Sequence, residues 1–174
     1  MGYRRSRYVI SDEIIAHSRA ALSASRESKN LNSLGMSHFL LGFGLLWRGD
    51  LDEAEEQMQE SLKLAERTGD VVLQSRCLTY LTVLYRKRGE IEKVRQYIPR
   101  CETVASTGQM IEYLATAKAN TAWVAWREGN LPEVNTNGQA ALEAWQQLPA
   151  GHASTAFRWT ALWPLQHFAL DCSC

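Results

Sequence analysis

The sequence predicts an all-α fold: a right-handed superhelical solenoid of antiparallel helix pairs, with about eight helices. Gly49, Gly89 and Gly129 recur at one constant interval, and each opens a similar phrase, at residues 49–54, 89–94 and 129–134. Between these phrases, apolar side chains recur at the spacing of an α-helix. An internal repeat of this length is typical of stacked helical arrays.

Each phrase is expected to form the corner between two antiparallel helices. Glycine can take the left-handed conformation that closes one helix, and an acidic or amide residue suits the first turn of the next. These pairs are Gly49 and Asp50, Gly89 and Glu90, and Gly129 and Asn130. Small or modest residues flank the corners and favour a close helical hairpin: Gly42, Thr82 and Ala122 before them, and Ala54, Val94 and Val134 after them.

The helices are expected in order between these corners and other turn signals. The first is expected to start at residues 11–13 and to include residues 14–25, and the others are expected over residues 34–47, 51–67, 71–88, 90–106, 109–128, 131–147 and from 154 to about 167. The repeat domain would then cover residues 11–168, with repeats starting near residues 9, 49, 89 and 129. Residues 1–10 are expected to be a disordered or tag-derived end, and residues 169–174 a tail.

Two local features qualify this pattern. Asn32 and Ser33 are expected to cap the helix that follows them. Pro99 lies inside a predicted helix, where an interior proline costs about 3 kcal/mol because it removes a backbone hydrogen bond and clashes with the preceding turn. We therefore expect a kink or break at Pro99, which would displace Cys101 relative to its repeat counterpart Ser61.

The chain is expected to be a segment of a longer array at both ends. Residues 14–25 correspond to the second helix of a hairpin whose first helix is missing. The glycine expected at position 169 is Ala169, and the segment before it is apolar, with Trp159 and Trp163. Arrays usually end in a capping element with a polar outer face. Self-association through the end helices is therefore one of the expected properties.

Composition excludes several classes of partner and compartment. Lysines plus arginines number 19, as do aspartates plus glutamates, so no net charge attracts nucleic acid or an anionic membrane. Four cysteines show no disulfide-framework spacing, which favours a reducing, cytoplasmic location. No secretory signal and no apolar run of roughly 18 residues is visible.

Motifs for chemistry are not found. The four histidines are far apart, and no zinc-site, nucleophile-elbow or phosphate-loop pattern occurs. His167 with Cys172 and Cys174 could bind a soft metal, but a tail is the preferred interpretation. We expect no catalytic residue, no metal site and no cofactor.

The corner residues resemble those of the tetratricopeptide repeat. The resemblance is carried by Gly42, Gly49, Asp50, Leu51, Ala54 and Ser61. That repeat usually has about 34 residues, whereas the interval here is 40. The longer interval, with phrases such as Arg158-Trp159-Thr160 and Trp163-Pro164-Leu165, looks like the helical repeats of LuxR/MalT-type regulators and related bacterial signalling ATPases. The resemblance implies a fold over residues 11–168 and says little about function.

An aromatic register on the first helix of each pair is the candidate binding surface. The interval that separates the corner glycines also connects Phe43, Val83, Trp123 and Trp163, and likewise Phe39, Thr79, Ala119 and Trp159. In the geometry of the family this face lines a concave groove, with Arg76 and Arg86 beside it and Trp47 and Trp126 at its margin. The alternative interpretation is that the register is core.

The function favoured by these observations is a protein-interaction or regulatory module in a larger bacterial signalling or transcription-regulating protein. A peptide would use the aromatic side chains as anchors and the arginines to bind a carboxylate. Two alternatives remain: a sensor that binds a small effector in the aromatic groove, and a self-association module. The candidate partner-binding residues are Phe39, Phe43, Arg76, Arg86, Trp123, Trp126, Trp159 and Trp163.

Overall fold

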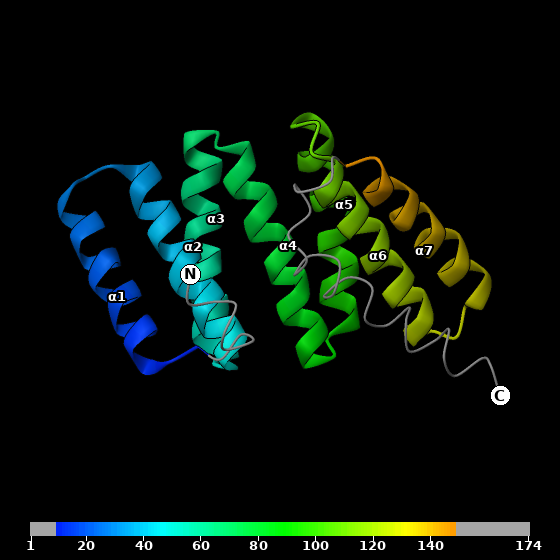
Figure 1. The fold of residues 1–174 in the computed structure, drawn as a ribbon, viewed down its shortest axis with the longest axis horizontal. Coiled ribbons are helices and arrows are strands. Elements are labelled where there is room, and N and C mark those ends of the chain that lie inside the picture. The colour runs from blue at the N-terminus through cyan, green and yellow to red at the C-terminus, as the bar shows by residue number, and fades with distance from the viewer. Residues whose placement is uncertain (1–9, 149–174) are drawn as a thin grey trace. The chain divides into compact units, whose positions relative to one another are not determined.

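Helices account for the fold throughout residues 10–148, the part of the chain that the computed structural model describes. They are α1 (Asp12–Glu27), α2 (Leu31–Arg48), α3 (Leu51–Thr68), α4 (Val71–Arg88), α5 (Ile91–Thr107), α6 (Ile111–Arg127) and α7 (Leu131–Gln146) (Figure 1). The predicted all-α repeat is confirmed over these residues. The expected helix at 154–167, the segment 1–9 and the tail at 169–174 lie outside them.

The chain separates into two compact units, residues 1–84 and 85–174, so the boundary lies inside α4. Unit 1 contains α1, α2, α3 and most of α4. Unit 2 contains the last turn of α4 and helices α5, α6 and α7. The right-handed superhelical course of the whole array stays a prediction. No helix within residues 10–148 has the length and apolar character that crossing a bilayer requires.

In unit 1, α2 pairs with α3 and also packs against α1 (Figure 1). The hairpin is close because Gly42 has no side chain: a Cβ there would lie 2.9 Å from Met58 Cγ and 3.2 Å from the Ala54 carbonyl oxygen. The buried Ser61 hydroxyl donates a hydrogen bond to the Gly35 carbonyl at 2.8 Å. The small residues predicted around the first corner therefore lie in the helix contact itself.

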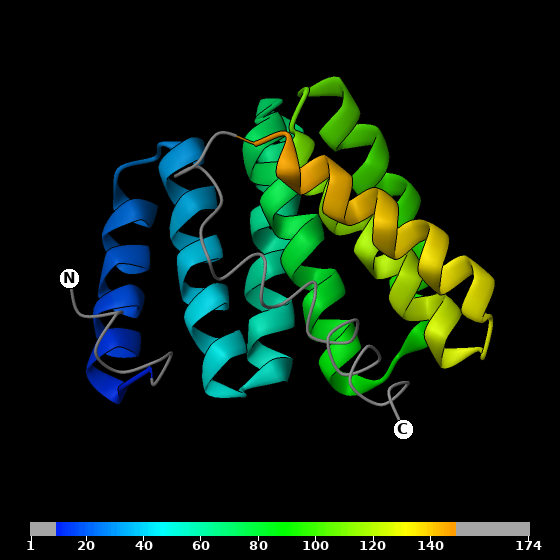
Figure 2. The same cartoon turned by 45° about the vertical axis from the view of Figure 1, so that its right-hand side comes forward.

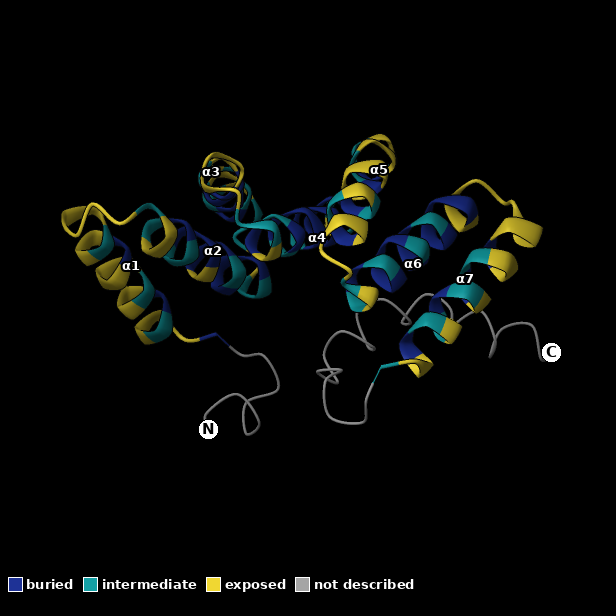
Figure 3. Ribbon diagram, turned by 90° about the horizontal axis from the view of Figure 1, so that it is seen from above, coloured by how far each residue is buried: buried dark blue, intermediate teal, exposed yellow. Residues whose placement is uncertain are grey.

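In unit 2, α6 pairs with α7, and α5 packs against α6 (Figure 2). A buried cluster of Ala115 and Ala119 from α6 with Ala141 and Trp145 from α7 joins the hairpin. In Figure 3, α6 is largely buried whereas α7 keeps an exposed outer face. The first helix of this hairpin is therefore the central one in its unit.

The predicted corner glycines are confirmed. Their φ angles are 101° at Gly49, 72° at Gly89 and 76° at Gly129, all in the left-handed region. Each is followed by a backbone N–H that bonds back to the closing helix, as Asn130 does to the Ala125 carbonyl at 2.9 Å. At the expected turn of Gly108 the arrangement differs, because Gly108 has φ −84° and Gln109 takes the left-handed conformation with φ 51°.

The structure corrects one local prediction in full and another in part. The side chain of Asn30, not Asn32 or Ser33, caps α2: its Oδ1 accepts from the backbone N–H groups of both later residues, at 3.0 and 3.1 Å. Of the kink or break expected at Pro99, the break does not occur, because α5 continues to Thr107, and the kink stays a prediction.

The packing of α5 explains why the helix survives its proline. Pro99 is exposed, whereas Val94, Ile98, Cys101 and Ala105 form a continuous buried face. Cys101 is therefore buried as its counterpart Ser61 is, with exposed fractions of 3% and 0%. Tertiary packing of the apolar face, which supplies most helix stability in proteins, offsets the lost backbone bond.

Candidate functional site

An aromatic cluster in unit 1 joins α2 to α4. Phe43 meets Tyr80 edge-on with ring centroids 4.9 Å apart, and Phe39 lies 5.7 Å from the same tyrosine. Phe39 and Phe43 are 6.0 Å apart, and Trp47 is 6.0 Å from Phe43. These edge-on and tilted contacts are the favoured arrangements of aromatic pairs. Phe39 is buried, whereas the other three rings are partly buried.

Beside this cluster lies an exposed apolar side chain, Leu40. It is 53% exposed and is followed on the same helix face by Phe43 and Trp47, at i+3 and i+7. We call Leu40, Phe43, Trp47 and Tyr80 the apolar patch. Arg76 lies one helical turn before Tyr80 and is partly buried. Within residues 10–148, the structure pairs Arg76 with no carboxylate.

A second cluster, in unit 2, gathers two arginines against one tryptophan. The guanidinium carbons of Arg86 and Arg127 lie 5.4 Å and 5.5 Å from the ring centroid of Trp123, within cation–π distance. Arg86 also donates from Nη1 to the Oδ1 atom of Asn120 at 3.0 Å. Asn120 is 1% exposed and Trp123 is 6% exposed. We call these four residues the arginine cluster.

The arginine cluster contains two positive charges and no negative one. Burial lowers the pKa of Arg86 to about 10, so the guanidinium is still charged at neutral pH. Among the described residues its partners are a neutral amide oxygen and an aromatic ring, not a carboxylate. A desolvated charge without an opposite charge is unfavourable. The cluster can therefore accept an anionic group.

The predicted strip of partly exposed side chains is wrong for two of its members. Phe39 and Trp123 are each 6% exposed, and the register positions Thr79, Val83 and Ala119 are buried too. The interpretation of the register as core holds for these five residues.

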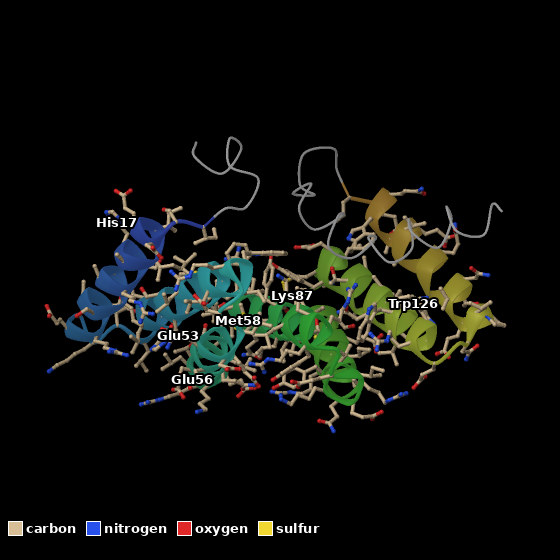
Figure 4. All side chains as sticks on the ribbon, turned by 90° about the horizontal axis from the view of Figure 1, so that it is seen from below. His17, Glu53, Glu56, Met58, Lys87 and Trp126 are labelled. Carbon is tan, nitrogen blue, oxygen red and sulfur yellow. The ribbon has the colours of Figure 1, made fainter. Side chains whose placement is uncertain are left out.

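The remaining candidates have mixed positions. Phe43, Arg76 and Arg86 are partly buried, and Trp126 on α6 is 38% exposed (Figure 4). Trp159 and Trp163 lie outside the described residues. The structure brings Phe43 to Phe39, and Arg86 to Trp123. Binding by any of them stays a prediction.

Sequence reasoning missed Leu40, Tyr80, Asn120 and Arg127. A signal for the first three was present, because the repeat interval leads from Leu40 to Tyr80 and then to Asn120. The same interval connects Trp47 with Arg127 through Lys87. The register that connects Leu40, Tyr80 and Asn120 therefore begins one residue after Phe39.

Two cysteines and one histidine are buried among the described residues. Burial raises the pKa of both Cys77 and Cys101 to about 12, so each thiol is protonated at neutral pH. Cys77 Sγ donates to Ser61 Oγ at 3.1 Å. The buried His38 shares a 2.8 Å hydrogen bond with Gln57. Residues 10–148 contain no cluster of side chains suited to hold a metal ion.

Comparison with known proteins yields no match, either to a protein-family model or to a curated protein.

Proposed function

We propose that this chain is a protein-interaction module that binds an acidic segment of a partner protein in the cytoplasm. The arginine cluster supports this proposal most directly. The resemblance of the corner residues to tetratricopeptide repeats points in the same direction, and extends the proposal to a regulatory segment of a larger bacterial signalling or transcription-regulating protein.

Arg86 carries a charge that no carboxylate balances among the described residues. A partner carboxylate would restore an ion pair at a partly desolvated site, where the interaction is stronger than on an open surface. The hydrogen bond to Asn120 and the ring of Trp123 hold the guanidinium in place before binding. A positioned group loses less entropy when it binds.

The shape of the arginine side chain also suits a carboxylate. Its planar guanidinium has donors in a fixed fork, which match the two oxygens of a carboxylate. Arg127 adds a second, exposed guanidinium at the same ring. The two arginines together favour a segment with one or more Asp or Glu side chains, or a free carboxyl terminus.

The apolar patch of unit 1 would provide a different kind of contact. Leu40 is exposed beside partly buried aromatic rings, and such surfaces accept apolar anchors of a partner. Arg76, unpaired within the described residues, lies one turn from Tyr80 and could bind a carboxylate near such an anchor. A partner would then carry both apolar and acidic side chains.

The experiment is a selection of random peptides displayed on phage, with the full chain as target. We expect selected peptides to be enriched in Asp and Glu. In fluorescence anisotropy, replacing those residues by Asn and Gln should weaken binding by about tenfold or more, because hydrogen bonds to charged groups contribute about 1.5–3 kcal/mol.

The matched variants are Arg86→Gln and Arg100→Gln. Arg86→Gln removes the charge but keeps donors for Asn120, so binding should weaken while the melting temperature is kept. Arg100 also lies over an aromatic ring, 5.4 Å from that of Tyr97, but on α5. Peptides without acidic residues, or equal effects of the two variants, would contradict the proposal.

A further inference from the structure

A pocket of about 210 Å³ lies in unit 2, away from the arginine cluster. Its lining comes from Arg95, Ile98 and Pro99 of α5, from Thr121, Val124, Ala125 and Glu128 at α6 and its C-terminal end, and from Glu133 of α7. The arginine cluster uses Asn120, Trp123 and Arg127 of α6, so the pocket occupies a different face of that helix. The two features can therefore be tested separately.

The walls of the pocket are apolar. They combine Ile98 and Pro99 on one side with Val124 and Ala125 on the other. Pockets for drug-sized ligands usually have volumes of about 300–1,000 Å³. This smaller pocket suits a ligand of a few heavy atoms with a short apolar stem.

The lining residues of the pocket offer several hydrogen-bond acceptors. Pro99 has no N–H, so the Arg95 carbonyl cannot receive the helix bond that residue 99 would normally donate. The Thr121 hydroxyl donates to the Ala117 carbonyl at 3.2 Å, which leaves the lone pairs of its oxygen as acceptors. The carboxylates of Glu128 and Glu133 complete this set.

The balance of charge in the lining is negative. Arg95 is its one cation and is held by Glu128 and, at 3.5 Å, by Glu92. This pairing raises the pKa of Arg95, with the hydrogen bond that Arg95 donates to Glu128 as the main cause. Glu133 accepts a 2.7 Å hydrogen bond from the Asn130 side chain, which is neutral. One negative charge in the lining therefore lacks a cationic partner within the described residues.

We propose that this pocket binds a small organic cation, an alkylammonium group on a short apolar stem. The stem would lie between Ile98, Pro99, Val124 and Ala125, and the ammonium group would donate to Glu133, to the Arg95 carbonyl and to Thr121. An ammonium has three donors and no acceptor, which matches a lining rich in acceptors. The inference does not depend on the proposed peptide function.

The test uses n-butylammonium as the probe, with n-butanol and butanoate as the neutral and anionic analogues. Titration of the full chain is followed by 1H–15N NMR. We expect butylammonium to shift the amide signals of Thr121, Val124 and Glu128, and the two analogues to leave them in place. Equal shifts from butanol or butanoate, or no shift from any probe, would overturn the proposal.

Two variants identify the groups responsible. Glu133→Gln keeps an acceptor for Asn130 but removes the charge, and should weaken butylammonium binding about fivefold. Glu143→Gln is the matched control, because Glu143 lies on the same helix outside the pocket lining and should bind as the wild type does. Equal affinities of the two variants would show that Glu133 does not bind the ammonium.

Pro99→Ala supplies the missing N–H and so satisfies the Arg95 carbonyl within the helix. This variant should melt at a higher temperature and yet bind butylammonium less tightly. A merely structural role for Pro99 would raise the melting temperature and leave the affinity unchanged, which would remove the carbonyl from the proposed site.

The same ammonium chemistry occurs in free amines and in lysine side chains. A blocked lysine, Nα-acetyl-lysine amide, separates these two sources. If it binds as well as butylammonium, the pocket can accept the lysine of a protein partner. If only butylammonium binds, the ligand is a free small amine. Binding of neither compound contradicts the proposal.

Discussion

Three residues of the apolar patch in unit 1 and three of the arginine cluster in unit 2 occupy the same positions of the repeat. Two repeat intervals connect Leu40 with Asn120, Phe43 with Trp123, and Trp47 with Arg127. Both units have an aromatic ring at the middle position of the three. At the first position the apolar Leu40 is replaced by the polar Asn120, and at the last position Trp47 is replaced by the cationic Arg127. In unit 1 the first of these side chains is 53% exposed, and in unit 2 it is 1% exposed.

The corners and the hairpin contacts specify the helices in both units, whereas the side chains at these first-helix positions differ in chemistry and in exposure. Gly49 and Gly129 have the same left-handed conformation in both units. The chemistry displayed beside them nevertheless differs. Helical arrays can vary their binding surfaces in this way without a change of fold.

The largest expected effect on the free energy of unfolding distinguishes the buried aromatic rings from the exposed Leu40. Trp123→Ala and Phe39→Ala should each lower the free energy of unfolding by about 3–5 kcal/mol, because each truncates a buried aromatic ring. Leu40→Ala should change it by less than about 0.5 kcal/mol. Urea unfolding measures all three. A small effect of Trp123→Ala would show that its ring is not core in solution.

The next effect concerns the corners that the two units share. Gly89→Val should destabilise the fold by about 1–3 kcal/mol, because a β-branched residue resists positive φ. No atom lies within 4 Å of a Cβ added at Gly89, so the effect would come from the backbone alone. Gly108→Val is the matched control, since Gly108 has φ −84°. Similar melting temperatures for both variants would argue against the left-handed corner.

A third prediction exchanges the chemistry of one unit for that of the other. Asn120→Leu places the residue of unit 1 into unit 2, and should cost about 1–3 kcal/mol because Arg86 loses its only amide partner within the described residues. Arg86→Met in the same chain should recover most of that stability, because it removes the unpaired charge. Thermal unfolding of both variants tests this. Failure of the second change to rescue the first would mean that Arg86 is well solvated.

A fourth effect is a dependence of stability on alkaline pH, with one buried thiol of the described residues in each unit. The folded state keeps Cys77 and Cys101 protonated up to about pH 12, whereas the unfolded chain releases these protons near pH 9. Between these values the folded state binds more protons, so stability falls as pH rises, by up to about 1.4 kcal/mol per pH unit for each thiol. Well below pH 9 the thiols are protonated in both states and contribute no pH dependence.

A chain with Cys77→Ala and Cys101→Ala is the control for that measurement, because lysines and tyrosines titrate in the same range. Its stability should fall less steeply than that of the wild type in urea unfolding between pH 9 and pH 10.5. Identical slopes would show that the thiols are accessible to water.

The sequence by itself determined the repeat interval, the corners and the order of the helices. These features depend on local chemistry: only certain residues accept positive φ, and apolar spacing defines a helix face. The prediction of the helix over residues 71–88 agrees with α4 at both ends. Other boundaries shift by a few residues where a neighbouring side chain, such as that of Asn30, supplies the cap.

Only the tertiary structure decided which residues of the aromatic register are buried. Burial of Phe39 and Trp123 depends on helices that approach from both sides, and the period of a single helix does not contain that information. Packing also kept α5 continuous through Pro99, against its local propensity. The pocket and the arginine cluster arise in the same way, from residues far apart in the sequence, such as Arg95 and Glu133, that only the packing of helices brings together.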